Sequence, residues 1–186
     1  MIQQKGETMS IFTNSASAAK EAGRAYTEAV LNLLGTKEPL VVLDELLPFL
    51  ESEISHLPEQ MLRRPEKPGK WSIIEVVQHL ADSELVWAYR LRMVIAHDQP
   101  EITGYDQDLW AKNLNYREVR YQHAIEQLRV LRALNLRLIA SLSVSQLQKY
   151  GVHNERGKES VAHMLKLYAV HDLVHRSHIV RIKSAV

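Results

Sequence analysis

Apolar residues recur along most of the chain at the spacing of helices rather than in the alternation of strands. The glycines and prolines fall largely between these periodic stretches. The pattern predicts long helices over residues 72–97, 118–142 and 160–185, and another over 39–54 in which Pro48 is a candidate kink. A shorter amphipathic helix is expected over 17–34, with Gly35 as its C′ residue. The chain is therefore predicted to be all-α, a four-helix bundle with an extra short N-terminal helix.

The start of the helix over 72–97 is marked by a capping box. Ser72 and Glu75 stand three residues apart, so that each side chain can satisfy a backbone N–H near the other residue. This start fixes the helical phase and places His79, Asp82 and Ser83 on one face with Glu75. Ligand-type residues on an otherwise apolar face indicate a candidate site inside the bundle.

The connection over residues 98–117 is long and polar. At about 20 residues it exceeds the usual length of a loop in a compact helical domain, and such loops are often functional or cross the bundle. Tyr105, Asp106 and Trp110 are therefore expected to roof a site. The alternative is that the two aromatic residues only cover the mouth of the bundle.

Composition narrows the class of protein. A chain of 186 residues suits one domain, expected over 17–186 after a loose tail over 1–16. The absence of cysteine excludes disulfides, thiolate metal ligands and a cysteine nucleophile. A net charge of +1 without a basic stripe argues against nucleic acid as a partner. No stretch resembles a signal peptide or a membrane span, so the expectation is a cytoplasmic protein that does not bind membranes.

The candidate chemistry lies in the last helix, where His171, His175 and His178 share one face. Histidines at i and i+4 have Cβ atoms about 5–6 Å apart, so that the pair His171 and His175 can bind one metal ion. A third ligand must come from elsewhere in the chain, and His79 is the best candidate.

Two common metal sites of helical proteins do not fit. A di-iron carboxylate bundle needs Glu-x-x-His on two helices, and the chain has this spacing only at Glu53 and His56. A zinc protease needs His-Glu-x-x-His, which is absent.

Several motifs together resemble the DinB-like (YfiT-like) family of metalloenzymes over about residues 39–182. They are Lys70-Trp71-Ser72, Glu75 to His79, Leu80, Asp82-Ser83-Glu84, Gly104-Tyr105-Asp106-Gln107-Asp108 and His171-x-x-x-His175-Arg176. The resemblance implies a four-helix bundle of the DinB/YfiT type and a divalent metal site with His79, His171 and His175 as its three ligands. His163 has no counterpart in the family and is expected to be a polar or packed histidine.

The chain departs from the family at the end of the last motif. Val174, Ser177 and His178 replace the histidine, glycine and glutamine of the commoner ending. The role of His178 is therefore open: it could be a hydrogen-bond donor to a ligand, an extra ligand or a substrate contact.

Three neutral imidazoles leave a divalent ion its charge and an open coordination position, which is typical of catalytic sites. Such an ion can lower the pKa of bound water to about 7 or hold a thiol as thiolate. The resemblance accordingly implies a hydrolase or an S-transferase that uses a low-molecular-weight thiol. The chain has no cysteine, so the thiol would be a cosubstrate. Zinc or nickel is the expected ion, and iron also suits imidazole ligands.

We therefore expect a metal-dependent enzyme acting on a small-molecule substrate, with Tyr105, Asp106 and His178 on the substrate side. Asp82 is expected to act as an acid–base group, or instead to orient an imidazole or pair with an arginine. The alternative from another class is a non-catalytic bundle that binds a small molecule or a protein partner. The resemblance also favours a homodimer, since related bundles pair through helix faces.

Overall fold

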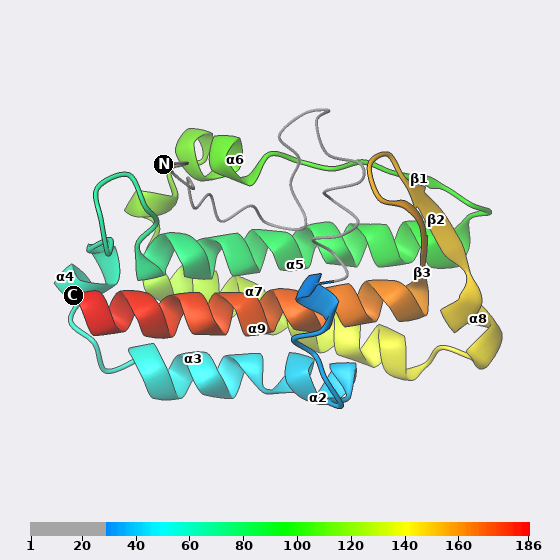
Figure 1. Ribbon diagram of the computed structural model, residues 1–186, viewed down its shortest axis with the longest axis horizontal. Helices are drawn as coiled ribbons and strands as arrows, with labels where there is room; N and C mark the ends of the chain where they lie inside the picture. Colours follow the sequence, from blue (N-terminus) through cyan, green and yellow to red (C-terminus); the bar gives the residue numbers. More distant parts are fainter. Residues whose placement is uncertain (1–28) are drawn as a thin grey trace, which may run out of the picture.

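The computed structural model describes residues 29–186, in which long helices run side by side along the longest axis of the molecule (Figure 1). The predicted all-α four-helix bundle is confirmed. Its members are α2 (Pro39–Asp44) with α3 (Leu46–Ile54), α5 (Ile73–Ala96), α7 (Tyr121–Ala140) and α9 (Val161–Ala185). None of the described helices is both long enough and apolar enough to cross a membrane.

The helix predicted over 39–54 is interrupted at Glu45, which separates α2 from α3. Pro48 accounts for the break, because it has no N–H to donate to the carbonyl of Asp44 and its ring would clash with that carbonyl. Glu45 keeps helical dihedral angles, with φ −75° and ψ −14°. As a result α2 and α3 continue one another along α9 and together form one side of the bundle (Figure 1).

The capping box predicted at the start of α5 is present. Ser72 N donates to Glu75 Oε2 over 2.8 Å, and Glu75 is also paired with Arg117 over 3.0 Å. From Ile73 to Glu84 every residue of α5 is buried. The N-terminal half of α5 is thus the centre of the bundle, and polar side chains on it must find partners inside the protein.

The connections contain more structure than the sequence pattern predicted. They include the short helices α4 (Glu59–Arg63), α6 (Gln107–Asn113), η1 (Tyr116–Glu118) and α8 (Val144–Gln148), and the strands β1 (Glu101–Ile102), β2 (Tyr150–His153) and β3 (Gly157–Ser160). The sheet has the order β1-β2-β3, with β1 parallel to β2 and β2 antiparallel to β3. Strands of two to four residues are too short to show the alternation that identifies strands in a sequence.

The sheet fixes the start of the long connection at one end of the bundle. Val152 N donates to Pro100 O over 2.9 Å, and Asn154 N donates to Ile102 O over 3.0 Å. A Cβ on Gly151 would lie 2.9 Å from the backbone carbonyl oxygen of Pro100, so the close approach of this segment to β2 favours glycine there. The connection then returns along α5, and α6 lies over the N-terminal half of that helix (Figure 1).

The tail expected over 1–16 and most of the helix expected over 17–34 lie outside the described residues. Residues 29–31 are helical, and Gly35 has φ 56°, the left-handed conformation predicted for its C′ position. Val30 and Leu34 are buried in the core. The proposed domain limits stay a prediction.

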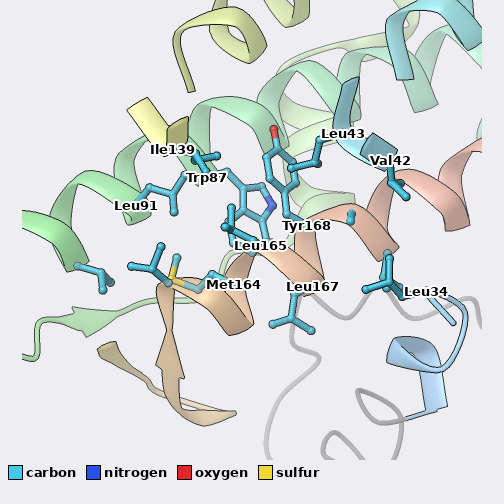
Figure 2. Close-up of a cluster of buried hydrophobic side chains, with 14 of the residues drawn as sticks. Leu34, Val42, Leu43, Trp87, Leu91, Ile139, Met164, Leu165, Leu167 and Tyr168 are labelled. Atoms are coloured by element: carbon cyan, nitrogen blue, oxygen red, sulfur yellow. The ribbon is translucent and has the colours of Figure 1, made fainter. Parts of the chain in front are cut away.

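Two hydrophobic clusters occupy the bundle, and a buried polar layer separates them. Figure 2 shows the first cluster, in which Trp87 of α5 stacks on Tyr168 of α9 with ring centroids 4.7 Å apart. On α9 this cluster ends at Val170, and the second cluster begins at Ile179. His171 and His175, two of the three candidate metal ligands, lie between these two positions.

Candidate metal centre

Three buried histidines meet in the polar layer. His79 comes from α5, and His171 and His175 come from successive turns of α9. One ring nitrogen from each lies within 4.8 Å of the other two, and the Nε2 atoms of His79 and His171 are 3.0 Å apart. The structure thus brings together the three residues predicted as ligands from positions 92 residues apart in the chain. The ligand assignment itself stays a prediction.

The chemistry of these histidines fits a divalent ion. Two nitrogens bound to one tetrahedral zinc ion lie about 3.3 Å apart, close to the observed separation. Imidazole must be neutral to bind a metal, and burial lowers the pKa of His79 to about 3. Burial also holds the pKa values of His171 and His175 well below the usual value. The Nδ1 atoms of His79 and His175 are buried without a hydrogen-bond partner among the described residues.

The lowered pKa of His79 predicts a pH-dependent stability of the metal-free protein. Below about pH 6.5 the unfolded chain binds a proton at this residue, whereas the folded protein does not until about pH 3. The free energy of unfolding should therefore fall as the pH drops, by up to about 1.4 kcal/mol per pH unit from this group. Urea unfolding of wild type and His79→Gln at about pH 7.5, 6 and 5, with chelator present, measures the difference in slope. The same dependence of the unfolding free energy on pH in both proteins would contradict the prediction.

His79 lies between an aromatic ring and a pair of hydroxyl groups. The ring of Trp71 is 5.0 Å from that of His79, measured between centroids. Ser83 Oγ lies 3.4 Å from His79 Nε2 and is hydrogen-bonded to Tyr105 Oη over 2.9 Å. Burial raises the pKa of Tyr105 to about 12, so its hydroxyl keeps its proton. The structure therefore places Tyr105 beside the histidines.

Asp82 is occupied by hydrogen bonds from neutral side chains. Its Oδ2 accepts from Tyr116 Oη over 2.6 Å, and its Oδ1 accepts from Gln127 Nε2 over 2.8 Å and from Gln78 Nε2 over 3.1 Å. These donors are a phenol and two amides, rather than the imidazole or arginine considered from the sequence. The network joins α5, η1 and α7, one helical turn along α5 from His79.

Asp106 caps the short helix that covers the site. Its Oδ1 accepts from the backbone N–H groups of Asp108 and Leu109, both over 2.9 Å. The cap fixes the start of α6, and the ring of Trp110 then packs 4.5 Å from that of Tyr105. Tyr105 and Trp110 are thus half-buried against each other, while Asp106 itself is exposed, and the roof over the site stays a prediction.

His178 lies at the edge of the histidine group. Its ring centroid is 6.1 Å from that of His175, and it is half-buried. Burial and the charge of Arg181 lower its pKa to about 4, while Glu66, which pairs with Arg181 over 2.7 Å, opposes this shift. The three-histidine group that could hold an ion does not include His178.

A buried ion triad beside the histidines was not predicted from the sequence. Arg132 of α7 donates to Glu84 of α5 over 2.9 Å and to Asp172 of α9 over 2.8 Å. The same guanidinium donates to Leu43 O and lies 4.8 Å from the centroid of the Tyr168 ring. Burial raises the pKa of Glu84 to about 7. The helical phase of α7 places Arg132 on the buried side, but which acids it meets depends on how the helices pack.

Comparison with known proteins gives the family. A family model described as the DinB superfamily matches residues 43–179. The chain belongs to the DinB superfamily. This membership agrees with the resemblance predicted from the histidine and Tyr105 motifs.

Related sequences carry a common name. A relative from Oceanobacillus iheyensis is 26% identical over 137 residues, which is 74% of this chain and 79% of the relative. A relative from Bacillus cereus is 27% identical over 141 residues, which is 76% of this chain and 81% of the relative. Both are named "Putative metal-dependent hydrolase".

The fold is also similar to that of a solved structure. YfiT from Bacillus subtilis is described as "a probable metal-dependent hydrolase with an unusual four-helix bundle topology". The two structures superpose with a TM-score of 0.73 at 19% identity, covering 95% of this chain and 97% of YfiT. At this identity the similarity establishes the shared bundle.

Proposed function

We propose that this DinB-superfamily protein is a metal-dependent enzyme acting on a small molecule, with His79, His171 and His175 as the ligands of one divalent ion. The observation that carries the proposal is the meeting of three buried imidazoles from two helices, with the Nε2 atoms of His79 and His171 3.0 Å apart. Three uncharged ring nitrogens this close together in the protein interior are stabilised when they bind one cation. The names of the relatives support the same class of protein.

The ligand set favours hydrolysis or thiol transfer. A divalent ion on three imidazoles can lower the pKa of water to about 7 or hold a thiol as thiolate. The chain's own contribution is a buried site, together with the hydroxyls of Ser83 and Tyr105 beside His79. A thiol would have to arrive as cosubstrate, because the chain contains no cysteine. Zinc or nickel suits the nitrogen ligands best, followed by iron.

Elemental analysis of the purified, tag-free protein is the first test. We expect about one divalent ion per chain, since three neutral nitrogens form a single site. The chelated protein and the reloaded protein are then assayed with panels of esters, amides and thiol acceptors. Turnover that requires the ion supports an enzyme, and the panel that responds distinguishes hydrolysis from thiol transfer.

Two outcomes would count against the proposal. Absence of bound metal, even after reconstitution, would leave a bundle that binds a small molecule or a protein partner. Stoichiometric metal without turnover across both panels would also favour this non-catalytic alternative.

A further inference from the structure

Tyr105 connects the metal centre with a hollow on the protein surface. Its hydroxyl is hydrogen-bonded to Ser83 over 2.9 Å, and Ser83 Oγ lies 3.4 Å from His79 Nε2. Tyr105 also lines the hollow, which runs along one side of α6 together with Asp106, Leu109, Trp110, Asn113 and Leu114. One side chain therefore contacts both the inner hydroxyl and the space that is open to solvent.

The hollow is suited to an apolar group. The rings of Tyr105 and Trp110 pack 4.5 Å apart at its wall. Leu109 and Leu114, which also line the hollow, are 52% and 54% exposed and so offer it apolar surface. Binding an apolar group on such a surface is favourable, because it removes apolar area from water.

On the buried side of α6 one hydrogen-bond acceptor has no donor among the described residues. Gln107 follows the capping residue Asp106 and is 7% exposed. Its amide oxygen Oε1 is buried and has no hydrogen-bond partner among the described residues. A buried acceptor without a partner destabilises the protein, and a polar bound molecule is one partner that could reach it.

We propose that the Tyr105 hydroxyl positions the substrate group that reaches the metal centre, and that the hollow on α6 binds an apolar group attached to it. The substrate is then a small molecule with a metal-binding head, such as a thiol or a carbonyl oxygen, and an apolar body. The inference rests on the proposed function, since it assumes an ion at the three histidines. Tyr105 is a positioning residue here, and Trp110 determines which apolar groups the hollow accepts.

Cobalt-loaded protein offers a direct test, because a thiol bound to cobalt produces a charge-transfer absorption band. Wild type, Tyr105→Phe and Trp110→Ala are titrated without oxygen with 2-mercaptoethanol and with benzyl mercaptan, which differ in the apolar body. Tyr89→Phe is the matched control, since Tyr89 lies on the same helix as His79 and is 64% exposed. Cobalt content and thermal unfolding are recorded for each protein.

Wild type is expected to bind benzyl mercaptan at least about tenfold more tightly than 2-mercaptoethanol. Tyr105→Phe should weaken both thiols by about three- to tenfold, as expected for the loss of one hydrogen bond, with the cobalt content unchanged. Trp110→Ala should weaken benzyl mercaptan alone, and Tyr89→Phe should match wild type.

Failure of the inference can be distinguished from failure of the proposed function. Wild type that binds no cobalt would overturn both. Cobalt-loaded wild type and Tyr105→Phe with equal thiol affinities would overturn the inference alone. Loss of cobalt from Tyr105→Phe would assign the residue to holding the bundle together and would also overturn it.

Discussion

Replacing His171 by alanine is expected to abolish stoichiometric metal binding while the bundle stays folded. A four-ligand zinc site contributes about 10–16 kcal/mol, so one protein ligand contributes about 3 kcal/mol and its loss weakens binding at least about 100-fold. The bundle should persist because two hydrophobic clusters on either side of the histidines hold the helices together. Elemental analysis after dialysis and the circular dichroism spectrum measure the two parts of this prediction.

His163→Ala is the matched control for that experiment. His163 lies on α9 like His171, but it is only half-buried and is not part of the three-histidine group. The control protein should keep its metal. Metal retained at wild-type stoichiometry in His171→Ala would refute the ligand assignment.

Replacing Arg132 by methionine is expected to destabilise the protein by about 3–5 kcal/mol. The arginine is the shared partner of Glu84 and Asp172, both 0% exposed, so its loss leaves two buried carboxylates without their counter-charge. Methionine fills most of the space of the side chain, so the effect reports mainly on the charge. Urea unfolding of the metal-free protein at neutral pH measures it.

Arg129→Met serves as the control on the same helix. Arg129 is paired with Glu51 over 2.8 Å, but both side chains are about half exposed and such pairs contribute little. Its unfolding midpoint should stay close to that of wild type. A midpoint for Arg132→Met equal to that of Arg129→Met would show that the triad is not needed for stability.

The sequence predicted those features that depend on residues close together in the chain. The capping box at Ser72 fixed the start of α5, and Pro48 indicated the interruption between α2 and α3. The four-residue spacing of His171 and His175 placed both on one face of α9. Each of these signals depends on residues within one or two helical turns, so no knowledge of packing is required.

Features that depend on contacts between distant parts of the chain were missed or left open by the sequence. The strands β1, β2 and β3 are short, and pairing stabilises them more than their own sequence. The sequence left open whether Asp82 acts as an acid–base group, orients an imidazole or pairs with an arginine. In the structure it accepts from Tyr116, Gln127 and Gln78, and the acid–base role stays a prediction. A side chain's phase on a helix tells which way it points, but not what it meets.

The sequence by itself determined an all-α bundle, the phases of its helices and the three histidines that could share an ion. Only the tertiary structure decided that the Tyr105 hydroxyl reaches Ser83 beside His79 and that Arg132 joins two buried acids. The physical reason is the range of the interactions. Helix propensity and capping act over a few residues, whereas the contacts around the site join α5, α6, α7 and α9 and exist only after these helices pack.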